Sequence, residues 1–353
     1  MRSFALAAAF AAALALPAPA FAQTATPASP AAILATAPAG TRFGLLVVDE
    51  QGREVMALRP DERFIPASNT KLFTTAAAMA LLQDQSAQGT ILGLARGKGR
   101  LPNLVILGNG TVNLSTVPAC TKDCLAPLLD QIAARANAVG DVIADDSAMS
   151  DQRWSPGMSW NNIPTDSGTA VSALNLDDNE LRIAVSAGAL GQPPAVQMQP
   201  YFTLRNEAVT APPGSKTQLS IERAVNGTEL RLYGTIAADA PPWSDRLGID
   251  DPAHYAAWTL RNMLLARGVK VSGQVRVRHR PQGLSDQPES GVALPERTST
   301  TVSPLASLMP PPLADDVVTI NKVSQNLHAQ ALFRRIGAPA LSEQWSSAAQ
   351  RKV

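Results

Sequence analysis

The sequence predicts an α+β protein with more than one domain. Stretches typical of helices and of strands follow one another irregularly, without the strict strand–helix–strand order of a doubly wound sheet. Short apolar runs broken by proline and glycine between residues 193 and 242 indicate a small β-rich module. No stretch repeats with a period of about 20 to 50 residues, which excludes a solenoid. The chain has 353 residues, enough for a large core divided among several domains.

Residues 1–22 have the three parts of a signal peptide. Arg2 is followed by an apolar run over residues 4–16 and by the cleavage pattern Ala20-Phe21-Ala22. The alternative, an uncleaved membrane anchor, needs about 20 apolar residues, and this run is shorter. We therefore expect export to the periplasm with cleavage of the signal peptide, while peripheral contact of the mature protein with a membrane stays open. Residues 23–41, rich in alanine, proline and threonine, indicate a flexible leader.

Charge and cysteine content exclude some classes of function. A formal net charge of +1 without basic runs disfavours nucleic acid as a partner. The two cysteines, Cys120 and Cys124, could form a disulfide outside the cytoplasm, although their spacing leaves open whether they are bonded. A metal site needs about four ligands, and His254, His279 and His328 are scattered along the chain. We expect a structural cysteine pair, no metal and no cofactor.

A predicted hairpin and helix place a serine next to a lysine. Apolar runs on either side of Gln51-Gly52 are typical of a β-hairpin. Pro66 then opens an alanine-rich helix, at a position where its missing N–H costs nothing. The helix has almost no polar residue after Lys71, so we expect it to be buried, with Ser68 and Lys71 held at one end.

The spacing of Ser68 and Lys71 suits nucleophilic catalysis. Residues three apart on a helix share a face, so the two side chains can touch. A serine hydroxyl becomes a good nucleophile when a neighbouring base takes its proton. A lysine can be that base if burial and the partial positive charge of a helix N-terminus disfavour its ammonium form. Taken alone, Ser68 could equally be a helix-capping residue.

Longer stretches resemble one family. "FIPASNTKLFTTAAAMALL" resembles the S-x-x-K motif of penicillin-recognising serine enzymes, and most of all the D-alanyl-D-alanine carboxypeptidase/endopeptidase family, the class C low-molecular-mass penicillin-binding proteins (peptidase family S13). "GLLVVDEQGREVMALRPDERFIPAS" is similar to the strand pair ahead of the family's serine, and "TAVSALNLDDNEL" resembles part of its large insertion. "VVTINKVSQNLHAQALFRRIG" matches the S-x-N motif at Ser324-Gln325-Asn326 and predicts a helix that ends at Gly337. The resemblance covers about residues 42–337.

The resemblance implies a fold and its division into domains. It implies a penicillin-binding/serine β-lactamase-like transpeptidase domain made of residues 42–88 and 295–353. Residues 89–294 would form a large inserted β-rich multi-domain segment, with a nested module at about residues 185–245.

The resemblance also implies roles for four site residues. Ser68 would be the nucleophile and Lys71 the base. Ser324 would relay a proton to the leaving amine, and Asn326 would bond Lys71 or the substrate amide. A second S-x-N pattern at residues 159–161 has no helix after it, and we expect it to be a chance match.

One family motif is missing. The family needs K-T-G or H-T-G on a strand that receives the substrate's terminal carboxylate and provides an oxyanion-hole N–H. The residues after Asn326 contain neither pattern. We therefore expect a truncated copy, with an incomplete catalytic domain and little or no peptidase activity.

The resemblance implies a serine-type D-Ala-D-Ala carboxypeptidase/endopeptidase with an acyl-enzyme on Ser68. Its partners would be peptidoglycan peptides ending in D-Ala-D-Ala, with β-lactams as covalent inhibitors. The missing motif leaves a second interpretation, a catalytically inactive wall-binding or scaffold remnant of the family. A β-lactamase is less favoured, because the segment between Lys71 and Ser324 is long.

Overall fold

The computed structural model describes residues 29–82, 89–97, 99–287, 290–292, 302–308 and 312–346, with the backbone alone at 31 and 338–346. The signal peptide expected at residues 1–22 lies outside the described residues. The chain falls into two units, Met1–Pro66 and Ala67–Val353, and each is described by itself. Within the described ranges, no helix combines the length and the apolar character needed to cross a bilayer.

The first unit holds a short helix and the predicted hairpin. Helix α1 (Pro30–Leu34) lies within the stretch expected to be a flexible leader. Strands β1 (Leu45–Val48) and β2 (Glu54–Leu58) pair antiparallel, which confirms the hairpin. Gly52 has φ +76° in the connecting turn, a conformation that glycine adopts without steric cost.

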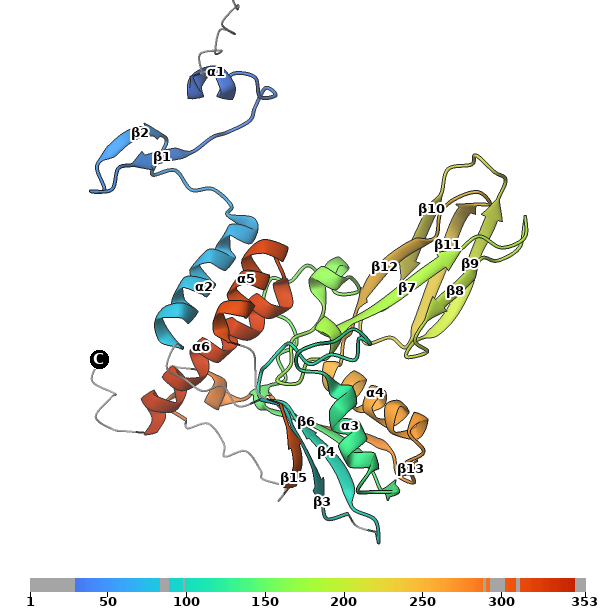
Figure 1. The fold of residues 1–353 in the computed structure, drawn as a ribbon. Helices are drawn as coiled ribbons and strands as arrows, with labels where there is room; N and C mark the ends of the chain where they lie inside the picture. Colours follow the sequence, from blue (N-terminus) through green and yellow to red (C-terminus); the bar gives the residue numbers. More distant parts are fainter. Residues whose placement is uncertain are drawn as a thin grey trace, which may run out of the picture. The chain divides into compact units, whose positions relative to one another are not determined.

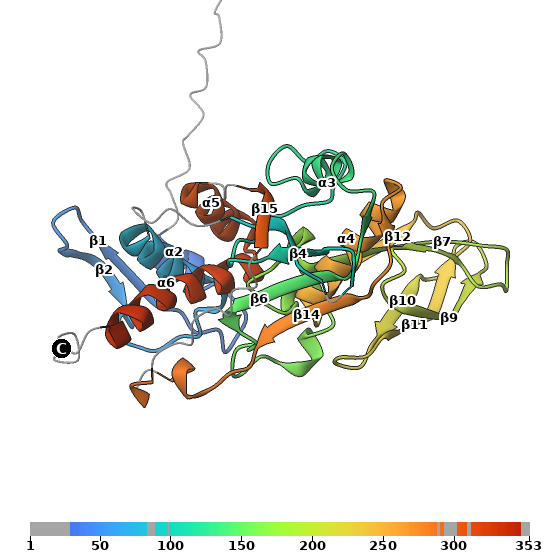
Figure 2. The same ribbon diagram turned by 90° about the horizontal axis from the view of Figure 1, so that it is seen from below.

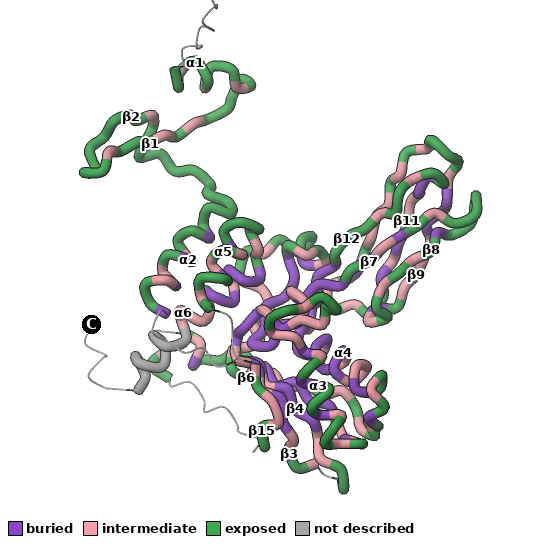
Figure 3. Tube along the Cα trace, viewed as in Figure 1, coloured by how far each residue is buried: buried purple, intermediate pink, exposed green. Residues whose placement is uncertain are grey.

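A five-stranded sheet organises the second unit (Figures 1 and 2). Its order is β14-β6-β4-β3-β15, in which β4 pairs parallel with β6 and β6 with β14, while β3 pairs antiparallel with β4 and β15. Helices α3 and α4 contact each other and pack on this sheet. Their apolar side chains join those of this sheet and of the two smaller sheets described next in the main core, coloured as buried in Figure 3. The bounds are β3 Ile91–Ala95, β4 Asn103–Leu107, α3 Leu125–Ala133, β6 Val142–Ser150, α4 Pro252–Ala266, β14 Val275–Arg280 and β15 Val302–Ser307.

Six further strands form two three-stranded sheets, gathered away from β3 and β15 (Figure 1). Their orders are β12-β7-β8 and β10-β11-β9, and only the β11–β9 pair is parallel. A small parallel pair, β5 with β13, adds to the unit. The bounds are β5 Ala138–Val139, β7 Glu180–Ser186, β8 Ala195–Met198, β9 Thr203–Ala211, β10 Gln218–Glu222, β11 Glu229–Ala237, β12 Trp243–Gly248 and β13 Lys270–Val271.

Short 3₁₀ helices connect many of these elements. Their bounds are η1 Ala67–Asn69, η2 Trp160–Asn162, η3 Asp166–Gly168, η4 Asp177–Asn179 and η5 Leu284–Asp286. The disulfide Cys120–Cys124 closes the loop just before α3.

Three helices pack together beside the sheets: α2 (Thr70–Leu81), α5 (Leu313–Val323) and α6 (Asn326–Ser346). Their shared core consists of Ala78, Leu82, Ile320, Ala329 and Leu332. The expectation of a buried α2 was only partly right, since Leu72 and Phe73 are exposed and only the face toward α5 and α6 is covered. The expected end at Gly337 was wrong, because α6 continues to Ser346. A glycine within a helix costs about 1 kcal/mol relative to alanine, too little by itself to end the helix.

Candidate active site

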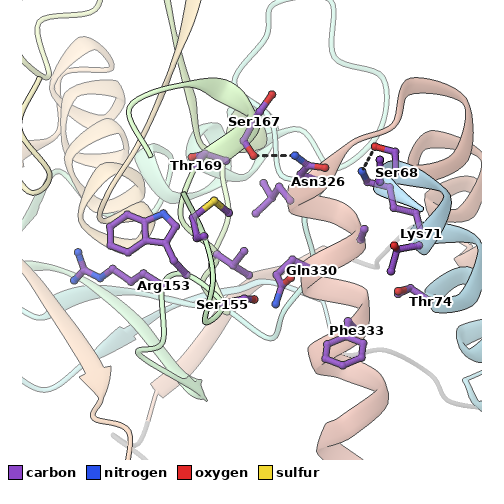
Figure 4. A pocket seen from close by; sticks show the side chains of 17 residues that line it. Ser68, Lys71, Thr74, Arg153, Ser155, Ser167, Thr169, Asn326, Gln330 and Phe333 are labelled. Carbon is purple, nitrogen blue, oxygen red and sulfur yellow. Dashed lines mark hydrogen bonds between the residues drawn. The ribbon is translucent and has the colours of Figure 1, made fainter. Parts of the chain in front are cut away.

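Ser68 and Lys71 lie where the chain enters α2. Ser68 is in the 3₁₀ turn η1, and Lys71 is in the first turn of the α-helix that follows. The Lys71 Nζ donates a hydrogen bond to Ser68 Oγ at 3.0 Å (Figure 4). The spacing predicted this contact, since positions i and i+3 share one face of a helix.

Ser324 completes a three-residue contact. Its Oγ accepts from Lys71 Nζ at 3.4 Å, so the amine stands between two hydroxyls. Ser324 separates α5 from α6 in a left-handed conformation, with φ +62°. A serine in this region carries a backbone penalty of about 1–2 kcal/mol. The surrounding helices therefore hold Ser324 in a bend that the sequence motif alone does not specify.

Lys71 is placed to act as a base. The residue is only 9 % exposed, and burial lowers the pKa of its ammonium group. No carboxylate of the described residues forms an ion pair with Lys71 Nζ to oppose this effect. The neutral amine is thus favoured relative to a solvated lysine, and it lies within hydrogen-bonding distance of the Ser68 hydroxyl.

Asn326, the first residue of α6, lies nearby but makes a different bond. Its Nδ2 donates to the backbone oxygen of Ser167 at 2.9 Å (Figure 4). Among the described residues, the amide forms no hydrogen bond with Lys71, while its contact with a substrate amide stays a prediction. The second S-x-N pattern lies elsewhere: Ser159 Oγ bonds Asn161 Oδ1 at 2.6 Å, and neither residue lines the pocket described next.

A pocket of about 470 Å³ opens beside Ser68, Lys71 and Asn326. One wall comes from the start of α2 and from α6, and the opposite wall comes from the loops at residues 153–158 and 167–171 (Figure 4). The second wall was missed from the sequence, because no motif marks it. The residues that contribute to it are Arg153, Trp154, Ser155, Met158, Ser167, Thr169 and Val171.

Asp146, Asp151 and His279 come nearest to a metal-binding set in the described part of the chain. Their potential ligand atoms lie within 4.8 Å of one another. Arg153 Nε, however, donates to Asp151 Oδ1 at 2.9 Å, so a guanidinium already provides positive charge there. The disulfide leaves no thiolate at Cys120 or Cys124 to bind a metal.

Solved structures share this fold. The chain is similar to the crystal structure of penicillin binding protein 4 (dacB) from Haemophilus influenzae, with a TM-score of 0.64 and 20% identity, covering 84% of this chain and 65% of that one. The same protein in complex with a novel β-lactam gives a TM-score of 0.56 at 20% identity, covering 81% and 58%. These similarities confirm an α+β penicillin-binding fold with additional β-rich segments.

The chain belongs to the D-Ala-D-Ala carboxypeptidase 3 (S13) family, whose model matches residues 28–353. It is 29% identical to the D-alanyl-D-alanine carboxypeptidase of Actinomadura sp. (strain R39) over 316 residues, 84% of this chain and 54% of that protein. It is 24% identical to the D-alanyl-D-alanine carboxypeptidase DacB of Haemophilus influenzae over 306 residues, 85% of this chain and 60% of that protein. The chain therefore spans a little more than half the length of these relatives. The predicted family is confirmed.

Proposed function

We propose that this protein is a serine-type D-Ala-D-Ala carboxypeptidase/endopeptidase that acts on peptidoglycan stem peptides through an acyl-enzyme on Ser68. The expectation of little or no peptidase activity, drawn from the missing K-T-G or H-T-G motif, concerns turnover of the peptide, so the test below follows acylation of Ser68. The observation that carries the proposal is the 3.0 Å contact between Lys71 Nζ and Ser68 Oγ, at a lysine whose pKa burial lowers. Membership of a D-Ala-D-Ala carboxypeptidase family supports the substrate class.

In the acylation step, neutral Lys71 accepts the proton of the Ser68 hydroxyl. The Oγ then attacks the carbonyl carbon of the penultimate D-alanine and forms a tetrahedral intermediate. The C–N bond breaks as the leaving amine takes up a proton from Lys71. Ser324 Oγ, 3.4 Å from Lys71 Nζ, can pass this proton on by accepting one and donating its own. The products are free D-alanine and an ester on Ser68.

In the second step, water attacks the ester carbonyl and Lys71 takes the proton of that water. The ester C–O bond breaks, Lys71 returns the proton to Ser68 Oγ, and the shortened peptide leaves as a carboxylic acid that ionises in water. A β-lactam would acylate the same hydroxyl by opening of its amide ring. We assign Asn326 a contact with the substrate amide, because it lines the pocket from the end of α6 nearest Ser324.

We also propose that the protein is exported to the periplasm. The disulfide Cys120–Cys124 supports this, since disulfides persist mainly in oxidising compartments. The signal-peptide pattern of residues 1–22 gives independent support from the sequence. Fractionation of expressing cells with N-terminal sequencing tests the proposal, and an uncleaved cytoplasmic protein contradicts it.

Fluorescent penicillin tests the catalytic proposal. The 353-residue chain is incubated with the label, and the intact mass and the labelled peptide are then determined. We expect one adduct on Ser68 that is lost in Ser68→Ala. Ser159→Ala is the matched control, since this serine belongs to the other S-x-N pattern and lies outside the pocket, and it should label like wild type.

Three outcomes count against the proposal. A folded wild-type protein that takes no label supports the scaffold interpretation. A label on another serine refutes the role of Ser68. Rapid release of the penicilloyl group, together with failure to cleave a D-Ala-D-Ala peptide, supports a β-lactamase.

A further inference from the structure

A histidine lies between carboxylates behind the second wall of the pocket. His279 is near the end of β14, where it pairs with Asp146 of β6 and with Asp251, the N-cap residue of α4. His279 Nδ1 lies 3.0 and 3.1 Å from the two carboxylate oxygens of Asp146. His279 Nε2 lies 3.3 Å from Asp251 Oδ2. Both ring nitrogens thus face carboxylates, with Asp151 Oδ1 3.9 Å from Nδ1, and Nε2 also lies 3.3 Å from Arg153 Nη2.

This environment favours the imidazolium form. The hydrogen bonds to Asp146 and then to Asp251 raise the pKa of His279 to about 10. Burial alone would raise the pKa of Asp251, but the hydrogen bonds from His279 and from the His254 N–H lower it to about 2. At neutral pH the ring therefore carries a proton on each nitrogen and connects two strands to the start of α4.

The same cluster holds Arg153, which lines the second wall of the pocket. Arg153 Nη2 donates to Asp251 Oδ2 at 3.0 Å, so Arg153 and His279 share this oxygen. Its Nε donates to Asp151 at 2.9 Å, and its Nη1 donates to the backbone oxygen of Asp250 at 2.8 Å. Figure 4 shows the guanidinium pointing away from Ser68.

Hydrogen bonds continue from Arg153 across the wall to Asn326. The Val171 N–H donates to the Arg153 backbone oxygen at 2.9 Å. Trp154 Nε1 donates to the backbone oxygen of Gly168 at 2.8 Å. The neighbouring carbonyl, that of Ser167, accepts from Asn326 Nδ2 at 2.9 Å. The wall is therefore bonded at one side to the His279 cluster and at the other to the residue that begins α6.

We propose that His279 is a positioning residue: as a cation between Asp146 and Asp251, it fixes Arg153 and thereby holds the wall formed by residues 153–158 and 167–171 against Asn326 and across from Ser68. The proposal rests on the proposed function. Without the cation, Asp146 and Asp251 repel each other. Arg153 then remains in contact with Asp151 and Asp251, and Arg334 is a further cation that acts on Asp151. The wall then loses its fixed distance to Ser68, and substrate is bound in fewer productive orientations.

Acylation kinetics test the proposal. We expect His279→Gln to lower the second-order rate constant for fluorescent penicillin by about ten- to a hundredfold, through weaker binding rather than slower chemistry once bound. His279→Lys should recover part of the loss, because it restores a cation that Asp146 and Asp251 can hold. Arg276→Gln is the matched control, since it removes a positive charge from an exposed position of the same strand, and it should react like wild type.

Limited proteolysis gives a readout that does not depend on activity. Trypsin cleaves after arginine, and the bonded Arg153 should be protected in wild type. We expect cleavage of the Arg153–Trp154 bond to become at least about tenfold faster in His279→Gln, relative to the exposed Arg63–Phe64 bond in the same sample. If His279→Gln does not fold, the double variant His279→Gln/Asp146→Asn, which removes one charge of each sign, takes its place.

The outcomes separate this inference from the proposed function. If wild type takes no label, the proposed function fails, while faster cleavage at Arg153 in the variant still supports the role of His279 in holding the wall. If wild type is labelled and His279→Gln shows unchanged acylation and cleavage, the positioning role is refuted. Loss of acylation in wild type on treatment with a chelator would also refute it, because the cluster would then be a metal site.

Discussion

Lys71 Nζ and Ser324 Oγ lie 3.4 Å apart although 253 residues separate them in the sequence. Their closeness follows from helix packing about two turns further along α2, where Ala78 meets Ile320 of α5 and Leu332 of α6 in one buried cluster. The apolar contacts therefore set the position of the bend that presents Ser324 to the amine. Because a close-packed core admits little adjustment, Lys71 Nζ and the Oγ atoms of Ser68 and Ser324 are held together before any substrate binds.

The rate of acylation should depend on the proton of Lys71. The proposed mechanism needs the neutral amine, so the rate should rise with pH through the pKa of Lys71. Since burial lowers this pKa, the midpoint should lie below the ordinary lysine value of about 10.4. Lys71→Arg keeps the positive charge but does not release its proton, and should slow acylation by about 10²–10⁴-fold.

The measurement is the labelling rate with fluorescent penicillin between about pH 6 and pH 10, for wild type and for Lys71→Arg. Ser159→Ala is the control and should follow the wild-type profile. A flat profile, or an arginine variant that reacts at the wild-type rate, would show that Lys71 is not the base.

Because Ser324 has a left-handed backbone, two substitutions can separate the effect of its hydroxyl on acylation from the effect of its backbone strain on stability. Ser324→Ala removes Oγ and keeps a side chain at φ +62°, whereas Ser324→Gly removes both Oγ and the steric cost. We expect both variants to slow acylation to a similar degree. Ser324→Gly should be more stable than Ser324→Ala by about 1 kcal/mol, measured by urea unfolding. If the alanine variant is the more stable of the two, the left-handed conformation is not a source of strain.

Local and long-range features differ in how well the sequence predicts them. The contact of Ser68 with Lys71 follows from helical spacing within one turn, and the hairpin around Gly52 follows from turn chemistry, so both could be predicted from nearby residues alone. Ser324 was found through its motif, but its left-handed bend results from the packing of α5 and α6. The bond from Asn326 to Ser167 joins segments distant in the chain, and no local pattern predicts it.

The wall of the pocket could not be predicted for the same reason. In the sequence, nothing distinguishes Arg153 from other loop arginines, and His279 is one of three histidines scattered along the chain. Only the pairing of β6 with β14 and the start of α4 bring their charges together. The exposure of Leu72 and Phe73 could not be predicted either, because the sequence of an apolar helix does not show which of its faces packs against other elements.

Lys71 should lower the stability of the folded protein at neutral pH. Its pKa is lower in the folded than in the unfolded state, so the unfolded state binds the extra proton, and the penalty is fully present below the folded pKa. Stability gained from deprotonation appears only as pH rises toward the unfolded value of about 10.4. Lys71→Met should therefore raise the unfolding free energy at pH 7 by about 1 kcal/mol while abolishing acylation.

The difference between Lys71→Met and wild type should shrink as pH rises toward about 10. His279, whose pKa is raised to about 10, loses its stabilising charge in this range, but both proteins carry it and its effect cancels in the difference. Urea unfolding at several pH values measures the difference. A Lys71→Met variant that is less stable than wild type at pH 7 would contradict the inferred penalty.

The buried ion pair between Arg223 and Asp250 should be the most sensitive point of the β-rich part of the chain. Arg223 follows β10 and Asp250 follows β12, and their side chains are 1% and 7% exposed. Two hydrogen bonds of 2.6 Å join Nη1 to Oδ2 and Nη2 to Oδ1. The guanidinium also lies over the ring of Phe202, 4.8 Å from its centroid.

Asp250→Ala would leave the Arg223 guanidinium buried without its counter-charge, and should cost about 3–5 kcal/mol of unfolding free energy. The double variant Arg223→Met/Asp250→Leu removes both charges and should recover most of this loss, because two apolar side chains need no partner in a dry interior. Asp130→Ala is the control, since its salt bridge to Arg267 has the aspartate side chain 68% exposed. Urea unfolding followed by circular dichroism measures all three. Equal losses of unfolding free energy for Asp250→Ala and Asp130→Ala would mean that burial does not set the strength of the Arg223–Asp250 pair. A double variant no more stable than Asp250→Ala would mean that the bonding geometry of the pair, rather than its charge balance, stabilises the β-rich part of the chain.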